Sequence, residues 1–402
     1  MDYESIFSVS ASKMKASKIR ELMKYAAMDG VISFGGGSPD SANFPFDDIR
    51  NIINGWDNKK MAVAMQYGTT DGYQPLIEAI KNRMINLKKL NPEGQKIMVT
   101  TGGQQGIYLI SKVLVSAGDV VLVEEPSFIG AMASFLSNQA ELVGVPLESD
   151  GVNLDKLEQT VIRLTNKGKK PKFFYTIPNF QNPAGVTMSQ AKRRRLYEIS
   201  KKYELVILED DPYGDLYFSG NADDYRPIKS YGNEAPIVYS GSFSKVLCPG
   251  FRLGWVFGDE QLIGKAGIAK QSVDACSSAF GQVLACDYLN SGVIDNYLTK
   301  MRAIYKEKKD FMVECIAKYM PTCKATNPNG GFFLYVDLPN GISGDALFKK
   351  TIQKNVAFVT GEPFHVDPVE GDKHLRFSYS GSSLENIEKG IKVIGEAVKD
   401  FS

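Results

Sequence analysis

A serine-rich turn in the second half of the chain carries residues suited to bind a phosphate group and to react with a carbonyl. The segment SGSFSKVLCPGFRLGW, residues 240–255, presents Ser242, Ser244 and Lys245, and Arg252 follows seven positions later. Hydroxyls, backbone amides and a bidentate guanidinium are typical phosphate ligands. A lysine beside a bound phosphate group can form an imine with an aldehyde of the same molecule. The alternative, a surface lysine in a polar loop, fits poorly with the apolar, glycine-rich run that follows Lys245.

A second cluster combines acidic side chains with a tyrosine. In LVILEDDPYGDLYF, residues 205–218, an apolar run delivers Glu209, Asp210 and Asp211, and Tyr213 lies three positions after Asp210. A carboxylate at the end of a buried strand is costly unless it is paired. A protonated pyridine nitrogen is one possible partner. A magnesium ion is the rival, although no Walker-type phosphate motif accompanies these carboxylates.

Two turns provide weaker signals. IPNFQNPAGVTMS, residues 177–189, contains an Asn-Pro-Ala-Gly turn in which Asn182 could bind a ligand or merely cap the turn. IMVTTGGQQGIYLI, residues 97–110, predicts a strand, a glycine turn and a helix whose first amides could bind an anion. This second motif matches neither GxGxxG nor GxxxxGK, so Gly102 and Gly103 could simply be packing glycines.

The elements that must position these residues alternate between apolar strands and amphipathic helices. Nearly continuous Val, Ile, Leu and Phe runs predict strands at 97–100, 120–123, 173–177, 205–208, 237–240 and 253–257. Between them, helices are predicted at 104–116, 127–138, 189–203 and 260–272. This alternation favours a largely parallel sheet covered by helices on both faces, and we expect it to form a large domain over residues 46–290.

The alternation of apolar strand and helix patterns ends near residue 290. A long charged helical stretch leads into GGFFLYVDLP at 330–339, and further strand and helix patterns follow. We therefore expect a smaller α+β domain over residues 291–402, which the N-terminal residues 1–45 join.

Composition excludes several classes of protein. With 47 basic and 46 acidic residues the formal net charge is +1, which creates no general attraction for nucleic acid or for anionic membranes. The basic run at 192–195 is interpreted as a solvated helix face. Five cysteines without a CxxC pair argue against disulfides and structural zinc, so no metal is expected. The sequence has neither a signal-peptide pattern nor a long uncharged apolar run, and we expect a cytoplasmic protein that does not contact the membrane.

Taken together in this order, the motifs resemble the fold-type I enzymes that depend on pyridoxal 5'-phosphate (PLP), in the class I/II aminotransferase family. The resemblance extends from FGGGSPD at 34–40 to HLRFSYS at 374–380. It implies an α/β fold with a mostly parallel, seven-stranded sheet in the large domain. It also implies transfer of an amino group from an L-amino acid to a 2-oxo acid such as 2-oxoglutarate.

Residues that match the family's motifs inherit its roles as expectations. Lys245 resembles the lysine that holds PLP as a Schiff base and then acts as the base. Asp210 resembles the carboxylate that pairs with the pyridinium nitrogen, because the family places a tyrosine three residues later. Tyr213 and Asn182 resemble the pair that hydrogen-bonds the phenolic oxygen of the cofactor.

The resemblance also implies a phosphate cup, formed by Ser242, Ser244 and Arg252 with the backbone of Gly103 and Gln104. Phe128, in EEPSFIG, matches the aromatic residue that stacks on the pyridine ring. Many relatives have a tyrosine there, so stacking would remain without a hydroxyl group. Tyr67, in QYGTTDGY, matches a tyrosine that reaches the phosphate of the neighbouring subunit, which implies a homodimer with shared active sites.

The substrate side is implied by four residues. Arg376 resembles the arginine that binds the α-carboxylate, Asn182 and Gly37 lie in the motifs that surround it, and Arg20 lies in an N-terminal segment that covers the active site in relatives. SKIRELMKYA at 17–26 and FGGGSPD most resemble the α-aminoadipate/kynurenine branch, so aminoadipate, aromatic or branched-chain donors are expected.

Another PLP activity on the same scaffold, as a lyase or a carbon–carbon-forming synthase, remains the alternative, and a sensor without turnover is a weaker one. Some relatives in the branch are transcription regulators with a fused DNA-binding domain. Only about thirty residues precede FGGGSPD here, so no such domain is expected. His365 and His374 are not needed for the transfer and are interpreted as surface or packing residues.

Overall fold

The larger sheet has eight strands, and most of them are parallel. A computed structural model describes residues 3–13, 28 and 30–401. The strands follow the order β2-β9-β8-β7-β6-β3-β4-β5, in which β9 is antiparallel to β2 and β8, and β5 is antiparallel to β4. Their bounds are Gln95–Thr100 for β2, Val120–Glu125 for β3, Glu141–Glu148 for β4, Gly151–Val152 for β5, Phe173–Thr176 for β6, Val206–Asp210 for β7, Ile237–Ser242 for β8 and Gly254–Asp259 for β9.

Each of the six predicted strands is present, and the parallel, helix-covered sheet is confirmed. The eighth strand beyond the expected seven is β5, a two-residue strand that forms a hairpin with β4. The four predicted helices correspond to α6 (Gly103–Leu114), α7 (Ile129–Ser137), α9 (Gln190–Tyr203) and α10 (Glu260–Gln271). The same part of the chain also contains α3 (Phe46–Asn54), α4 (Asn58–Met65), α5 (Gln74–Lys88), α8 (Leu154–Asn166) and α11 (Ala279–Asn290).

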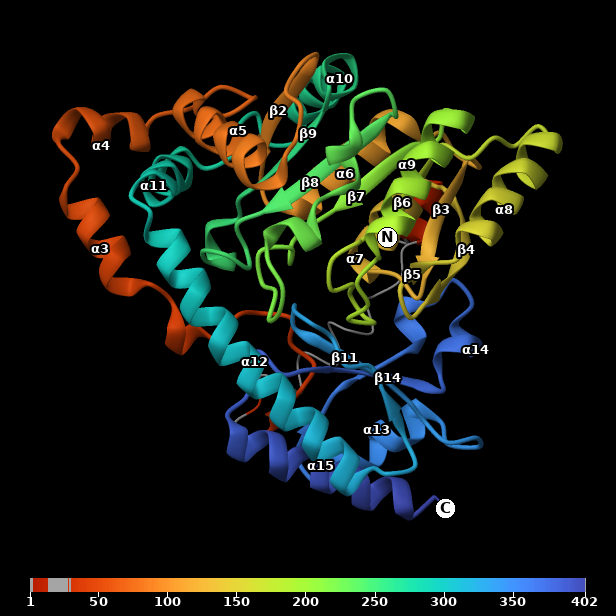
Figure 1. The fold of residues 1–402 in the computed structure, drawn as a ribbon. Coiled ribbons are helices and arrows are strands. Elements are labelled where there is room, and N and C mark those ends of the chain that lie inside the picture. The colour runs from red at the N-terminus through yellow and green to blue at the C-terminus, as the bar shows by residue number, and fades with distance from the viewer. Residues whose placement is uncertain (1–2, 14–27, 29, 402) are drawn as a thin grey trace.

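Alternating side chains of the central strands divide the core into two layers. Val121 and Val123 of β3 pack into the cluster that includes α6 and α10, whereas Val120 and Leu122 pack against α8 and α9. This alternation follows from the two-residue period of a strand, and burial on both faces explains why the strands are apolar throughout. Figure 1 shows α8 and α9 together at one side of the sheet.

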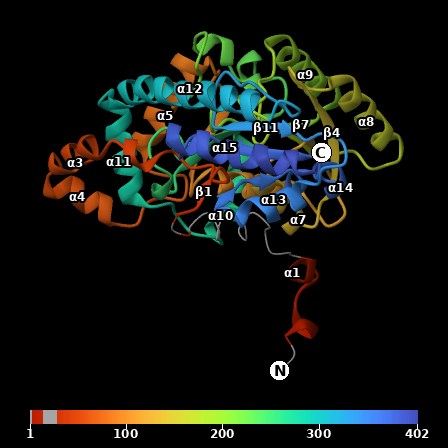
Figure 2. The same ribbon diagram turned by 90° about the horizontal axis from the view of Figure 1, so that it is seen from below.

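A smaller antiparallel sheet lies below the first one (Figure 1). Its order is β10-β11-β14-β13, and Tyr335 of β11 is paired with Arg376 of β14. The bounds in this region are Val293–Tyr319 for α12, Lys324–Ala325 for β10, Phe333–Asp337 for β11, Gly344–Ile352 for α13, Val356–Ala357 for β12, Val359–Thr360 for β13, Pro368–Gly371 for α14, His374–Ser378 for β14 and Leu384–Lys399 for α15. Helices α12 and α15 pack side by side beneath this sheet (Figure 2).

The beginning of the chain is joined to its end. Strand β1 (Ile32–Ser33) pairs in parallel with β12, and Phe34 donates its backbone N–H to Ala357 O at 2.8 Å. Further N-terminal, α1 (Val9–Lys13) contacts α7. The remaining helical segments are short 3-10 turns at Glu4–Ile6, Ser41–Asn43, Ala222–Tyr225, Ile228–Tyr231, Pro249–Phe251 and Glu362–Phe364.

One interpretation of the sequence is wrong in part. Arg193, in the basic run of α9, is fully buried instead of solvated. Its guanidinium donates to the carbonyls of Met188 and Pro178 at 2.8 and 2.9 Å and to Asn179 Oδ1 at 2.7 Å. A buried charge is tolerated when its donors are satisfied in this way.

Candidate active site

Lys245 lies in the turn that follows β8, at the carboxyl end of the parallel strands. The side chain is partly buried, and its Nζ donates a hydrogen bond of 2.6 Å to Gly37 O in the N-terminal segment. Burial, and then the positive charges of Arg252 and Arg376, lower the pKa of Lys245 to about 8. A lysine in this state is available as a neutral amine near physiological pH, which a nucleophile or a base requires.

Asp210 is the last residue of β7, and its neighbour Asp211 is turned toward a different strand. Tyr175 of β6 donates to Asp210 Oδ2 at 2.8 Å, and Tyr239 of β8 donates to Asp211 Oδ2 at 2.9 Å. Since β7 lies between β6 and β8, the two carboxylates diverge and do not form one chelating pair. Burial raises the pKa of Asp210 to about 7, so a cationic partner would strongly favour its ionised form.

Arg376, on strand β14 of the small sheet, lies near Lys245. This β14 residue is buried, and it donates to Asn182 Oδ1 at 3.0 Å and to Gly35 O at 2.6 Å. The rings of Phe333 and Phe364 lie 4.4 and 4.9 Å from the guanidinium carbon. Burial lowers the pKa of Arg376 to about 10, yet it stays cationic at neutral pH. Its Nε is buried without a hydrogen-bond partner in the described structure, which leaves a donor for an acidic ligand.

Tyr213 completes this group of buried side chains. Its ring packs edge-on against Phe332 and Phe333, with centroids 5.5 and 5.9 Å away. Burial raises the pKa of Tyr213, so the phenol keeps its proton. It can therefore donate a hydrogen bond to an anionic oxygen.

The expected phosphate ligands gather where α6 begins. Gly102 caps this helix with φ of 78°, and a Cβ atom there would lie 2.6 Å from Arg252 Nη2. Arg252 therefore lies directly over the helix N-terminus, whose first amides attract anions. A Cβ on Gly103 would lie 3.8 Å from Ser242 Cβ, and Ser244 donates its N–H to Ser242 Oγ at 3.1 Å.

Phe128 and Gln104 lie beside each other. A Cβ on Gly130 would come within 2.5 Å of both the Phe128 ring and Gln104 Oε1. Gln104 Nε2 donates to Gly130 O and to Ser134 Oγ at 2.7 Å each. The start of α6 and the start of α7 are thereby joined.

One expected residue, Tyr67, is not part of this group, and another cannot be placed. Tyr67 follows α4 and has 88% of its surface exposed. Arg20 lies outside the described residues.

Sequence reasoning missed Glu124, a buried carboxylate of β3. Its side chain accepts hydrogen bonds from Thr176 Oγ1 at 2.5 Å and from Gln181 Nε2 at 3.2 Å. Burial raises the pKa of Glu124 to about 7. Gln181 directly precedes Asn182, so Glu124 fixes the turn that carries this residue. The sequence does contain a sign of this residue, because the apolar run VVLVEE ends in carboxylates just as VILEDD does.

The two histidines pack against each other. The rings of His365 and His374 are parallel with centroids 5.6 Å apart, and Tyr335 stacks on His374 at 5.1 Å. Tyr335 Oη also lies 3.1 Å from His365 Nε2, and Glu125 Oε1 lies 3.3 Å from His365 Nδ1. This contact joins the end of β3 to the small sheet.

The residues present fit PLP. The helix N-terminus under Arg252 suits a phosphate, Asp210 suits a pyridinium nitrogen, and the partly buried Lys245 suits an aldehyde. The unpartnered Nε of Arg376 suits the carboxylate of an amino acid. Fold and site together place the protein among the PLP-dependent enzymes of fold type I.

Comparison with known proteins narrows this class. The profile of "Aminotransferase class I and II" matches residues 30–394, so the chain belongs to that family. The chain is 41% identical to "Aromatic-amino-acid aminotransferase 1" of Thermococcus litoralis, over 100% of this chain and 95% of the relative. The protein is therefore a PLP-dependent aminotransferase.

Solved structures of aminotransferases superpose closely on this chain. Kynurenine aminotransferase of Pyrococcus horikoshii, in complex with PMP, superposes with a TM-score of 0.95 at 38% identity and covers 99% of this chain and 98% of its own. The alpha-aminoadipate aminotransferase of Thermus thermophilus, complexed with N-(5'-phosphopyridoxyl)-L-leucine, has a TM-score of 0.89 at 33% identity. That match covers 100% of this chain and 99% of the other.

Within the described part of the chain, no helix is both long and apolar enough to cross a membrane.

The anion site above α6 gives the first prediction. Gly102→Ala should weaken PLP binding at least about tenfold, because its Cβ would displace Arg252 and because φ of 78° strains any residue with a side chain. Titration of the apoenzyme with PLP, followed by absorbance, measures the effect. Gly118→Ala is the matched control, since Gly118 has φ of 83° but open space around its Cβ position. Equal losses in both variants would contradict the anion site.

Proposed function

We propose that this aminotransferase moves the amino group of an aromatic L-amino acid to 2-oxoglutarate. The observation that carries the proposal is Arg376, a buried cation with a free Nε donor held between the rings of Phe333 and Phe364. Such a site offers a charged clamp for a carboxylate directly beside aromatic surface. The aromatic aminotransferase of Thermococcus litoralis and the kynurenine aminotransferase of Pyrococcus horikoshii support the same donor class.

The proposed reaction uses side chains that bind the substrate, move its Cα proton and hold the cofactor ring. Arg376 binds the substrate carboxylate and so orients the Cα–H bond. Lys245, whose Nζ is oriented by Gly37 O, takes the proton from Cα and later returns it. PLP supplies an aldehyde that carries the amino group and a ring that accepts negative charge from Cα. Asp210 holds the proton on the ring nitrogen, while Asn182 and Tyr213 hydrogen-bond the phenolic oxygen.

The remaining cofactor contacts belong to the same proposal. Ser242, Ser244 and Arg252, with the backbone amides of Gly103 and Gln104, bind the phosphate group. Phe128 stacks on the pyridine ring. Residues 46–290 then form the PLP-binding domain, residues 291–402 form the small domain, and residues 1–45 join the latter and cover the site.

A half-reaction tests the donor class. Single amino acids are added to the PLP-loaded enzyme without an acceptor, and the absorbance change to the aminated cofactor is followed. Phenylalanine, tyrosine, tryptophan and kynurenine should convert the cofactor faster than 2-aminoadipate, leucine and alanine, and should release the matching oxo acid. Preference for 2-aminoadipate or alanine would overturn the proposed donor.

The second prediction concerns Lys245. Lys245→Ala should lower turnover by roughly a thousandfold or more while the protein stays folded, because both the anchor of the cofactor and the base are removed. Borohydride reduction of the PLP-loaded wild type, followed by peptide mapping, should label Lys245. Label on another lysine would contradict the assignment.

We further propose a cytoplasmic homodimer in which Tyr67 reaches the phosphate of the other subunit's cofactor. The support is its position: 88% of Tyr67 is exposed, and Met65 beside it on α4 is 77% exposed. Exposed apolar side chains in a row are typical of interfaces.

Subunit mixing provides the third prediction. Tyr67→Ala and Lys245→Ala should each be nearly inactive, the former at limiting PLP. A mixed dimer of the two variants has one site with both defects and one site with neither, so isolated mixed dimers should show up to about half of the wild-type activity. No recovery in dimers shown to be mixed would mean that Tyr67 acts within its own subunit.

The fourth prediction concerns Arg20. We propose that it binds the second carboxylate of 2-oxoglutarate and moves away for an apolar side chain. Arg20→Ala should raise the KM for 2-oxoglutarate more than about tenfold, since a charged hydrogen bond contributes roughly 1.5–3 kcal/mol. The KM for aromatic donors should hardly change, and Lys18→Ala serves as the control for loss of charge. Equal effects on both substrates would remove Arg20 from the site.

A further inference from the structure

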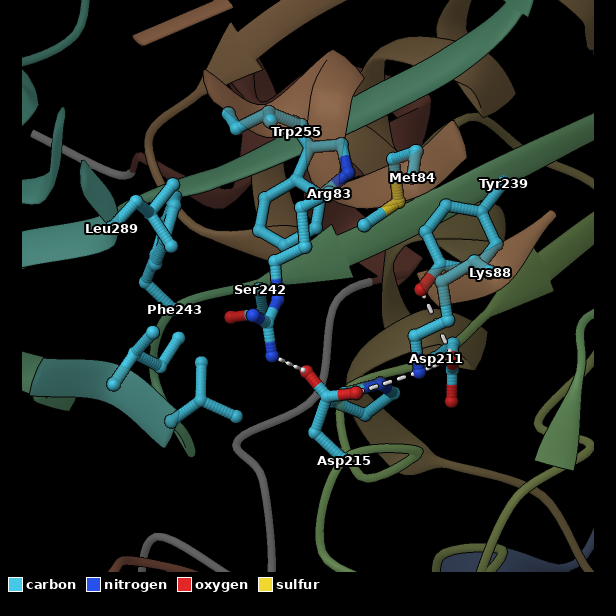
Figure 3. A pocket seen from close by; sticks show the side chains of 14 residues that line it. Arg83, Met84, Lys88, Asp211, Asp215, Tyr239, Ser242, Phe243, Trp255 and Leu289 are labelled. Atoms are coloured by element: carbon cyan, nitrogen blue, oxygen red, sulfur yellow. Dashed lines mark hydrogen bonds and ion pairs between the residues drawn. The ribbon is translucent and has the colours of Figure 1, made fainter. Parts of the chain in front are cut away.

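A group of charged side chains surrounds Asp211, the residue that follows Asp210. Asp211, Asp215, Lys88 and Arg83 line a cavity between α5 and the strands β7 and β8 (Figure 3). Lys88, the last residue of α5, lies 2.8 Å from Asp215 Oδ1 and 3.6 Å from Asp211 Oδ2, and Arg83 lies 3.0 Å from Asp215 Oδ2. The side chain of Asp211 is fully buried, and that of Lys88 is 6% exposed.

The buried part of this arrangement is balanced in charge. Two cations from α5 face two carboxylates from the segment after β7, and Figure 3 shows the dashed contacts that connect them. Burial opposes the charge of Lys88, but attraction to Asp215 and then Asp211 holds the pKa of Lys88 above its usual value. Removal of one partner from such a group leaves an unpaired buried charge.

Asp211 is held in place by neutral donors as well. Tyr239 Oη donates at 2.9 Å, and Asn179 Nδ2 donates at 2.9 Å to the other carboxylate oxygen. Arg193 donates to Asn179 Oδ1 and not to Asp211 itself. Among the residues that the structure describes, Lys88 is therefore the cation within ion-pair distance of Asp211.

The balance matters because Asp211 is covalently adjacent to Asp210. Burial raises the pKa of Asp210, and the charge of Asp211 adds to this rise. An uncompensated negative charge on Asp211 disfavours the carboxylate form of Asp210. The proton would then move from the ring nitrogen toward Asp210.

We propose that Lys88 is a positioning residue for the transfer reaction, which neutralises Asp211 and thereby keeps Asp210 ionised against the cofactor nitrogen. Lys88 acts through Asp211 and touches neither substrate nor cofactor. The inference rests on the proposed role of Asp210.

Other carboxylates lie near this region, and each of them has its own partners. Glu209 directly precedes Asp210 in β7. It accepts hydrogen bonds from the backbone N–H groups of Ile228 and Lys229 at 2.7 and 2.9 Å. Asp295 pairs with Arg83 at 3.4 Å, and its side chain is 70% exposed. Glu124 is bound by Thr176 and Gln181.

The fifth prediction compares single and double substitutions in the PLP-loaded enzyme. Lys88→Met should lower kcat about tenfold to a hundredfold with the KM for the donor within about threefold. The acid limb of the pH titration of cofactor absorbance should move up by about one pH unit, as a charge several ångströms away implies. Lys88→Met/Asp211→Asn removes both charges and should restore kcat and the titration to near wild type. Lys88→Arg should stay close to wild type.

Two further variants complete the design. Lys309→Met removes another buried lysine, which pairs with Asp310 at 2.5 Å, and should leave the titration unchanged. Asp211→Asn alone removes the negative charge next to Asp210 and leaves Lys88 paired with Asp215, so it should move the acid limb to lower pH. This shift remains measurable if Lys88→Met does not fold.

Different results would contradict the role of Lys88 and the role of Asp210. An unshifted titration in Lys88→Met, or an equal loss in the double variant, would overturn the role of Lys88. An unshifted titration in Asp211→Asn would do the same. If Asp210→Asn instead kept wild-type activity, the proposed role of Asp210 itself would be wrong.

Discussion

Charge burial is the constraint on which the rest of this structure depends. Asp210 and Arg376 are 5% and 4% exposed, and Lys245 is partly buried beside them. Burial raises the pKa of Asp210 to about 7, so this group destabilises the fold progressively as the pH rises from the usual aspartate range to about 7, and the loss stays constant above that value. Burial lowers the pKa of Lys245 to about 8, so its protonated form has the same effect as the pH falls from the usual lysine range. Near neutral pH both penalties are present together. A ligand that supplies a pyridinium and anionic groups relieves them, which couples stability to cofactor binding.

The sequence predicted most of what lies close together along the chain. Lys245 with Arg252, and Asp210 with Tyr213, are fixed by spacing within a strand and its following turn, and the strands themselves are long apolar runs. Strand β4 was missed because Gly144 and Pro146 interrupt the run ELVGVPLE. Contacts across the chain could not be derived in this way. The hydrogen bond from Lys245 to Gly37 O spans 208 residues, and that from Arg376 to Gly35 O spans 341.

The interpretation of Arg193 failed for a related reason. Arg194 and Arg195 beside it are exposed. Helical period places Arg193 on the face of the buried Leu196 and Tyr197, but it cannot show that a buried guanidinium finds acceptors. What decides its position is a set of carbonyls from the loop after β6, which no local pattern contains. Lys88 is a comparable case, since it closes α5 yet pairs with carboxylates from the segment after β7.

The N-terminal segment after β1 connects the two sheets chemically. Gly37 O accepts from Lys245, Gly35 O accepts from Arg376, and Asp40 Oδ2 pairs with Lys308 of α12 at 2.9 Å. Backbone carbonyls carry partial negative charge, so they orient buried cations without neutralising them. Arg376 gives one Nη1 donor to Asn182 and one Nη2 donor to Gly35, and its Nε remains free. Nε and the neighbouring terminal nitrogen form one edge of a guanidinium, and a carboxylate can accept two hydrogen bonds side by side from such an edge. In the proposed role of Arg376, the same contacts that hold the arginine in the fold would therefore fix the edge that binds the substrate carboxylate.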